Sequence, residues 1–342
     1  MSHTSPDWIR ISTAAAITLG LANGSFHRGA RLRGLNLLLT YEEPCSGRCA
    51  YCGLAGNRQP LGDTSFIRVD WPVVPLDEVI ARVKADGRGL ERVCVAMQTH
   101  RRAMGDLLYI AGRIKQETDL LLSALITPTC VGKKEFEELQ AVGVDMVGIA
   151  VDCATKGLFE ALRGRGAGGP HRWERYWAGV EEAVSVLGAG RVGIHLIVGL
   201  GETEHEAVAA IQRAQDLGAR THLFSFFPEP GSLMQEQRPP SLGRYRRVQL
   251  ARYLINEGLA RLEGMRFDSG GRLVDFGIGQ ELLDETISTG LPFMTSGCPG
   301  KDGCTVACNR PYGNERPSGC IRNFPFPPEE RDLFFIRRQL WA

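Results

Sequence analysis

Residues 35–52 read Leu-Asn-Leu-Leu-Leu-Thr-Tyr-Glu-Glu-Pro-Cys-Ser-Gly-Arg-Cys-Ala-Tyr-Cys. This stretch is an apolar, strand-like run followed closely by Cys45, Cys49 and Cys52. Thiolates at the spacing C-x3-C-x2-C can bind three irons of a [4Fe–4S] cube and leave the fourth iron without a protein ligand. Because an iron with an open position can bind a substrate or cosubstrate, the pattern predicts a catalytic cluster rather than a structural one.

A zinc site is the alternative, since C-x2-C pairs also bind zinc. Structural zinc takes four protein ligands, and no second C-x2-C pair follows within about twenty residues. The three cysteines, with Tyr51 immediately before the last of them, resemble the radical S-adenosylmethionine (SAM) superfamily. The resemblance implies that Cys45, Cys49 and Cys52 hold a SAM-binding [4Fe–4S] cluster and that Tyr51 lies beside the adenine of SAM.

Outside this loop, apolar strand-like runs alternate with amphipathic helix-like runs, the pattern of a parallel α/β sheet. Six strands are expected, at Leu35–Thr40, Arg92–Met97, Leu120–Ile126, Met146–Val151, Val192–Val198 and Thr221–Phe226. Helices with apolar residues at intervals of three and four are expected at Leu76–Asp86, Arg101–Gln116, Lys133–Val142, Thr155–Arg163, Trp173–Leu187 and Glu204–Leu217.

Six β/α units in about 200 residues predict an α/β fold with a partial (β/α)6 TIM-type barrel, which the SAM resemblance also implies. Residues 34–265 would form this barrel. Residues 1–33 are expected to form an N-terminal helical extension, with Ser5 as the N-cap of a helix that ends near Asn23. After a long helix over Leu242–Leu262, a short strand and a helix over Gln280–Thr289, residues 266–342 are expected to end in an irregular, Cys-rich extension.

Composition limits the classes of function. Of the 342 residues, 43% are hydrophobic and 23% are charged, which is ordinary for a globular protein. A net charge of +1 argues against a nucleic-acid partner. The sequence contains no run of about 18 apolar residues, so we expect no membrane span. Residues 1–7 do not resemble a secretory signal. Ten clustered cysteines without such a signal indicate metal ligation in a reducing compartment, so we expect a cytoplasmic metalloenzyme.

Chemistry in such barrels takes place at the carboxyl ends of the strands. Gln98 and Thr99 follow the second predicted strand, where the superfamily resemblance implies contacts with the methionine amino group of SAM. Asp152 follows the fourth strand and could contact the ribose or methionine part. Alternatively, Asp152 could be a turn residue that caps the next helix.

The segment Gly193–Glu202, which begins in the fifth predicted strand, resembles a superfamily motif in which an apolar residue packs on the adenine. In this sequence that residue is Val198. His195 lies inside the same strand, either as a hydrogen-bonded barrel residue or as a side chain that touches SAM.

A second group of cysteines lies in the C-terminal tail, at Cys298, Cys304, Cys308 and Cys320. The intervening residues are small and flexible, so the chain can wrap around a metal centre. We expect a second, auxiliary [4Fe–4S] cluster here, with Cys320 as the leading fourth ligand. A zinc knuckle is the structural alternative.

Other features have simpler interpretations. Cys94, Cys130 and Cys153 are expected to be small core residues. The glycine-rich run at residues 163–171 is either a mobile lid or a flexible connection. The arginines of the long helix are expected to form a solvated face; they are Arg244, Arg246, Arg247 and Arg252.

The tail also resembles the two-subunit lipoyl synthases of archaea and some bacteria. Three tail segments carry this resemblance: Ser296-Gly-Cys-Pro-Gly, Cys308-Asn-Arg-Pro-Tyr-Gly-Asn-Glu-Arg-Pro and Ile321-Arg-Asn-Phe-Pro. Barrel segments also match, at residues 169–174, 195–203 and 245–253. The similarity covers about residues 10–327, and the barrel itself is shared with biotin synthase.

This resemblance implies a substrate, an octanoyl group on a lysine of a carrier protein or peptide. It also implies that the tail cluster supplies the sulfur, that a sister subunit adds the other sulfur, and that a ferredoxin or flavodoxin supplies electrons. Three alternatives remain open. They are a radical SAM enzyme whose tail cluster conducts electrons, as in peptide maturation; a biotin-synthase-like enzyme acting on a small molecule; and a non-catalytic iron–sulfur scaffold or electron-transfer protein.

Overall fold

The computed structural model describes residues 3–56, 65–66, 69–87, 89–309 and 321–342. At its centre lies an eight-stranded sheet in the order β10-β9-β8-β7-β6-β2-β1-β5. Six strands pair in parallel: β2 (Gly34–Leu39), β6 (Arg92–Ala96), β7 (Leu121–Ile126), β8 (Val144–Asp152), β9 (Val192–Val198) and β10 (Arg220–Ser225). Each agrees with a strand predicted from the sequence to within two residues.

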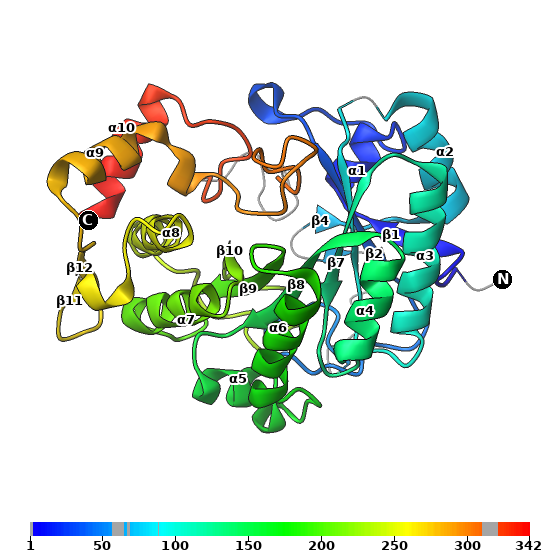
Figure 1. Ribbon diagram of the computed structural model, residues 1–342, viewed down its shortest axis with the longest axis horizontal. Helices are drawn as coiled ribbons and strands as arrows, with labels where there is room; N and C mark the ends of the chain where they lie inside the picture. The colour runs from blue at the N-terminus through cyan, green and yellow to red at the C-terminus, as the bar shows by residue number, and fades with distance from the viewer. Residues whose placement is uncertain (1–2, 57–64, 67–68, 88, 310–320) are drawn as a thin grey trace.

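Helices follow these strands along the chain and cover the outer face of the curved sheet (Figure 1). They are α2 (Leu76–Asp86), α3 (Ala103–Glu117), α4 (Lys133–Ala141), α5 (Lys156–Leu162), α6 (Trp173–Leu187) and α7 (Glu204–Asp216). Every residue of β2 is buried, as expected for a parallel strand covered on both faces. Because β10 and β5 form two separate edges of the sheet, the barrel is open, and the predicted partial TIM-type barrel is confirmed.

The N-terminal segment differs from the predicted single helix. It forms β1 (Trp8–Ile11), which pairs antiparallel with both β2 and β5 (Val73–Pro75), followed by the short helix α1 (Thr13–Thr18). The side chain of Ser5 accepts a hydrogen bond from Thr40 N at 3.0 Å, next to the end of β2, and caps no helix. The physical reason lies in the alternation of Trp8–Ile11, which buries two isoleucines completely within the sheet.

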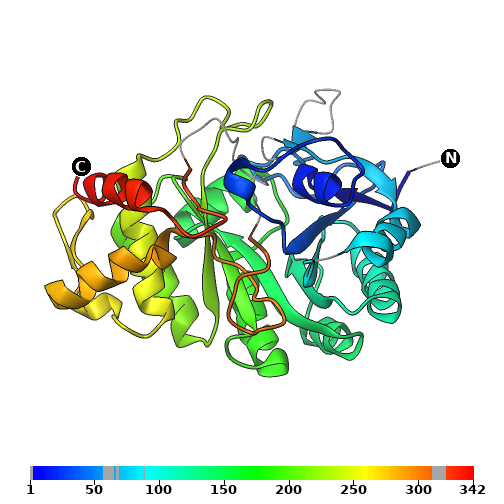
Figure 2. The same ribbon diagram turned by 90° about the horizontal axis from the view of Figure 1, so that it is seen from above.

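The C-terminal part packs against the side of the barrel, and the two chain ends lie at opposite ends of the molecule (Figure 2). Its elements are α8 (Leu242–Asn256), β11 (Arg266–Phe267), β12 (Leu273–Asp275), α9 (Gln280–Thr289) and α10 (Glu330–Leu340). Further short elements are β3 (Ser65–Phe66), β4 (Val69–Asp70) and the 3-10 turns η1 (His27–Gly29), η2 (Arg165–Ala167), η3 (Leu262–Gly264) and η4 (Leu291–Phe293). The predicted helix after the barrel is six residues too long, since α8 ends at Asn256 and the chain turns at Gly258, where φ is +70°.

The expectation of a solvated arginine face on α8 is wrong for three of its four arginines. Arg246, Arg247 and Arg252 are all less than 7% exposed. Arg247 forms a bidentate ion pair with Glu204 of α7 and also donates to Leu340 O of α10 at 2.8 Å. The arginines therefore fasten the C-terminal segment to the barrel, a role that local sequence cannot show because the acceptors lie far away along the chain. None of the described helices is long and apolar enough to cross a membrane.

Candidate active site

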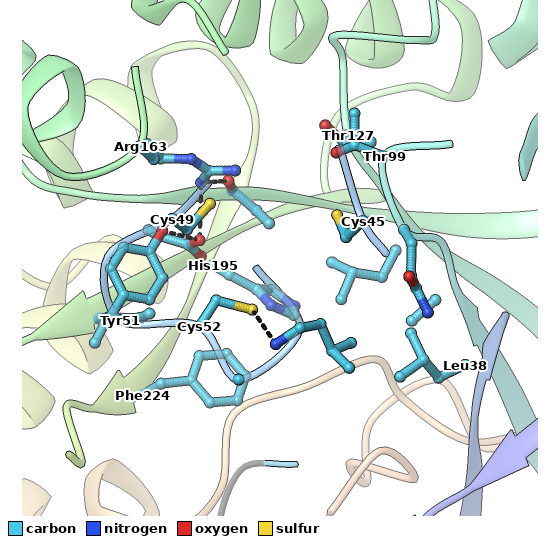
Figure 3. Close-up of a pocket in the computed structure, with 18 of the residues that line it drawn as sticks. Leu38, Cys45, Cys49, Tyr51, Cys52, Thr99, Thr127, Arg163, His195 and Phe224 are labelled. Atoms are coloured by element: carbon cyan, nitrogen blue, oxygen red, sulfur yellow. Dashed lines mark hydrogen bonds and ion pairs between the residues drawn. The ribbon is translucent and has the colours of Figure 1, made fainter. Parts of the chain in front are cut away.

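A cavity of about 250 Å³ opens at the carboxyl ends of the parallel strands. The three cysteines of the first motif, Cys45, Cys49 and Cys52, all line it (Figure 3). Apolar side chains from the strands and their following loops form much of the remaining wall, among them Leu38, Trp71, Ala96, Leu125, Ile197 and Phe224. The site therefore joins a thiol-rich loop to an apolar chamber inside the barrel.

Backbone hydrogen bonds hold the cysteine loop in place. Ser46 N donates to Thr99 O at 2.9 Å, and Ala50 N donates to Leu162 O at 2.7 Å. Within the loop, Gly47 N approaches the Cys45 sulfur at 3.3 Å, and Leu54 N approaches the Cys52 sulfur at 3.4 Å. Such N–H groups stabilise the thiolate form that iron requires.

The chemistry of this donor set fits a cluster with one open iron. Burial raises the pKa of Cys49 to about 11 and raises the pKa of Cys52 as well, so binding of a metal would have to displace the protons. Among the described residues, no three His, Cys, Asp or Glu side chains already stand in the arrangement of a closed metal site.

Beside Cys49 lies a buried hydrogen-bond network. The Tyr51 hydroxyl donates to Asp152 Oδ2 at 2.6 Å, and Arg163 Nη1 donates to the same oxygen at 2.8 Å. Arg163 Nη2 then donates to the Tyr176 hydroxyl at 2.9 Å, and that hydroxyl lies 3.0 Å from His171 Nδ1. Burial, with the charge of Arg163, lowers the pKa of His171 to about 3, so the ring is neutral near pH 7.

Most of the predicted SAM contacts converge on this cavity. Tyr51, Gln98, Thr99, Asp152 and His195 all line it. Gln98 is oriented by a hydrogen bond from its Nε2 to Leu39 O at 2.8 Å.

Asp152 does not cap the following helix, the alternative that the sequence left open. That position belongs to Thr155, whose hydroxyl accepts from Leu158 N at 3.2 Å. Asp152 itself has a φ of +63°, a left-handed conformation uncommon outside glycine, which places its carboxylate between Tyr51 and Arg163.

The structure places Ile197 at the cavity in the position expected for Val198. Val198 is completely buried in the outer core between the sheet and its covering helices, whereas Ile197 lines the cavity. Side chains alternate between the faces of a strand, so His195 and Ile197 share the inner face and Val198 points the other way.

Sequence reasoning missed Arg163, Thr127 and His171 as cavity residues. Arg163 and His171 are the two ends of the glycine-rich run that was interpreted as a lid or flexible connection. In the structure this run is a tight, packed turn, because a Cβ on Gly169 would lie 2.2 Å from Arg163 O. An arginine and a histidine bracketing a run of glycines were the available signal.

The tail cysteines lie away from this cavity. Cys298 is buried, Cys308 is half-buried and Cys304 is exposed, and none of the three lines the cavity. Cys320 lies outside the described residues. Of the three isolated cysteines, only Cys153 is the buried core residue that was predicted, since Cys94 is half-buried and Cys130 is exposed.

The chain matches the family model of the radical SAM superfamily over residues 43–214, which is half of its length. Together with the open barrel and the three cysteines at its mouth, this match shows that the chain belongs to the radical SAM superfamily. Membership implies a [4Fe–4S] cluster and SAM, and the donor set at the barrel mouth fits both.

Comparison with solved structures supports the fold. The FeFe-hydrogenase maturase HydG from Carboxydothermus hydrogenoformans aligns with a TM-score of 0.53 and 18% identity over 66% of this chain and 52% of that chain. Methylornithine synthase (PylB) aligns with a TM-score of 0.51 and 13% identity over 72% of this chain and 67% of that chain. The chain thus spans about half the length of the maturase. Comparison with curated protein sequences found no significant match.

Proposed function

We propose that this radical SAM protein inserts sulfur at an unactivated C–H carbon of an octanoyl group carried by a protein or peptide, as one subunit of a two-component lipoyl synthase. Cys45, Cys49 and Cys52 would hold a cluster that, together with SAM, would supply the radical chemistry for removing a hydrogen atom from the octanoyl chain. The tail cysteines would hold an auxiliary cluster as the source of the sulfur. The protein positions the reactants and excludes water.

The observation that carries the proposal is the position of the apolar chamber between two groups of thiols. At the carboxyl ends of the strands, Cys45, Cys49 and Cys52 border the cavity. At the amino ends of the same strands, Cys308 lies 3.4 Å from Asn36 Nδ2 of β2. An alkyl chain in the apolar chamber would therefore lie between the radical source and the sulfur source.

The described tail cysteines do not lie at the barrel mouth, where Cys45, Cys49 and Cys52 border the cavity. Asn36 is two residues before the cavity residue Leu38 on β2, so Cys308 approaches from the opposite end of the barrel. Within the described residues, the tail cysteines thus leave the mouth to a long substrate arm, as a carrier-bound octanoyl group requires.

The network around Asp152 would position SAM. Tyr51 and Arg163 both donate to this carboxylate, so its orientation is fixed while its exposed edge faces the cavity. A fixed carboxylate at a strand end can accept hydrogen bonds from a ribose hydroxyl or from the methionine ammonium. Ile197 and Phe224 supply apolar surface for the adenine ring.

The test is anaerobic reconstitution followed by turnover with an octanoyl-lysyl peptide, a strong reductant and SAM. Wild type should hold about eight irons and the Cys298/Cys308→Ala variant about four. The variant should still form 5′-deoxyadenosine but no thiolated peptide. Thiolated product from the variant, or no loss of cluster sulfide during wild-type turnover, would overturn the sulfur-donor role and favour an electron-conducting cluster.

A further inference from the structure

Residues 298–308 of the C-terminal tail form a hairpin that packs against the amino end of the barrel. Cys308 N and Ala307 N donate to Cys298 O at 3.2 and 2.9 Å, so the two tail cysteines lie next to each other. The hairpin contacts the first residue of β2, since a Cβ on Gly34 would lie 2.7 Å from Ala307 O. In Figure 1 the orange C-terminal segment runs from α9 towards the strands.

The hairpin is fixed at the first residue of β6 as well. Arg92 is 1% exposed, and its Nε donates to Pro299 O at 2.7 Å. The same guanidinium forms a bidentate ion pair with Asp145 at 2.5 and 2.9 Å. A buried and rigidly held cation therefore lies beside the tail cysteines, where it would offset the negative charge of thiolates.

A third cysteine, Cys94, lies on a strand beside these two tail cysteines. Sheet register aligns Cys94 of β6 with Asn36 of β2 on one side and with Ser123 of β7 on the other. Asn36 Nδ2 donates to the Cys308 sulfur at 3.4 Å, and Cys298 lies beside Cys308 in the hairpin. Because a sheet neighbour of Cys94 contacts Cys308, and Cys308 lies beside Cys298, the three cysteines lie near one another.

Three neighbouring cysteines, one of them buried and two half-buried, carry more negative charge as thiolates than the single Arg92 cation can offset. A soft metal centre would offset the remaining charge, because thiolate sulfur is the preferred ligand of zinc and of iron–sulfur clusters.

We propose that Cys94, Cys298 and Cys308 are three protein ligands of one metal centre, with Asn36 hydrogen-bonding to the sulfur of Cys308. Cys304, expected from the sequence to be a ligand, is excluded from this set. It is exposed in the loop between the paired residues Pro299 and Val306 of the hairpin.

The proposed metal centre lies next to the active-site cavity, towards the amino ends of the strands. Cys94 precedes Ala96 by two residues on the same face of β6, and Ala96 lines the cavity. Two residues of a strand span about 6.6 Å. A metal centre on Cys94 would therefore form the floor of the apolar chamber, which the two tail cysteines alone would not reach. That the metal is an iron–sulfur cluster rests on the proposed function, but the ligand set does not.

The first test compares single variants of the full chain after anaerobic reconstitution. Cys94→Ala should halve the iron and acid-labile sulfide content, whereas Cys304→Ala, a substitution in the same hairpin, should leave both unchanged. The iron that remains in Cys94→Ala should sit in the cluster of Cys45, Cys49 and Cys52. Its EPR signal, perturbed by added SAM, would show that the barrel is folded. Unchanged iron in Cys94→Ala, or halved iron in Cys304→Ala, would overturn the proposal.

A second test needs no variant and so is independent of misfolding. Metal-loaded wild type is treated with iodoacetamide, and each cysteine is quantified by mass spectrometry before and after chelation. Cys94, Cys298 and Cys308 should be protected until the chelator is added, while Cys304 should be alkylated throughout. Alkylation of Cys94 at the same rate in loaded and chelated protein would refute the ligand set. Protection of all three with zinc bound in place of iron would support the ligand set but overturn the proposed function.

Discussion

Replacing Arg163 with methionine should destabilise the protein more than any substitution of an exposed arginine. Arg163 is 3% exposed, and its guanidinium donates to Asp152, Tyr176 and the backbone oxygen of Val151 at 2.8, 2.9 and 3.2 Å. Removing one partner of a buried ion pair costs about 3–5 kcal/mol. Because Asp152 keeps its hydrogen bond from the Tyr51 hydroxyl, we expect Arg163→Met to lower the free energy of unfolding by about 3 kcal/mol, the lower end of that range.

Urea unfolding under anaerobic conditions, followed by tryptophan fluorescence, measures this loss. The matched control is Arg165→Met, two residues away on an exposed side chain, which should change the free energy of unfolding by less than about 0.5 kcal/mol. In a double-mutant cycle with Asp152→Asn, the two losses should be less than additive by about 1–3 kcal/mol. A loss below about 1 kcal/mol for Arg163→Met, or additive losses in the cycle, would refute the view that this pair organises the site.

Three further results are expected. Because burial lowers the pKa of His171 to about 3, its imidazole takes up a proton between about pH 6.5 and 3 only in the unfolded chain. The free energy of unfolding should therefore fall as the pH drops through this window, with a slope that approaches about 1.4 kcal/mol per pH unit. In urea unfolding, His171→Asn should flatten this dependence of stability on pH. An unchanged dependence in the variant would contradict a neutral, buried imidazole. Arg247→Met should cost about 3–5 kcal/mol, because it leaves the buried carboxylate of Glu204 without its cation, and a loss under about 1 kcal/mol in urea unfolding would instead fit a solvated helix face. Val198→Ala should lower the free energy of unfolding by about 2 kcal/mol and leave the affinity for SAM unchanged. Ile197→Ala should weaken SAM binding about fivefold in calorimetry. Weaker SAM binding in Val198→Ala but not in Ile197→Ala would mean that the two faces of the strand are misassigned.

The regular part of the barrel follows from local patterns. Helices α2, α6 and α9 and strand β9 begin and end where the hydrophobic periodicity places them. Each of these elements buries one or both of its faces along its whole length, so the regular spacing of its apolar residues can be seen in the sequence. The N-terminal segment did not obey such a pattern, because Trp8–Ile11 is too short to distinguish a strand from a helix, and its pairing partners lie far away in sequence.

Parts of the site could be predicted in the same way. Cys45, Cys49 and Cys52 fall within one short loop, so their spacing alone restricts them to a shared centre. The strand-end positions of Gln98 and Asp152 were predictable because parallel strands carry their functional groups at one edge. Choosing Ile197 over Val198 required knowledge of which strand face points inward, since both faces of a buried parallel strand are apolar.

The sequence by itself therefore determined the radical SAM barrel, its three-cysteine loop and the edge of the sheet at which the chemistry lies. Only the tertiary structure decided which distant residues meet. It brought Asn36 of β2, the sheet neighbour of Cys94, next to Cys308 of the tail, left Cys304 exposed and buried three of the four arginines of α8. The physical reason is that a cysteine or arginine has no preferred partner along the chain. Its role depends on which thiol or carboxylate the packing of remote segments places within a few ångströms, and no local period encodes that distance.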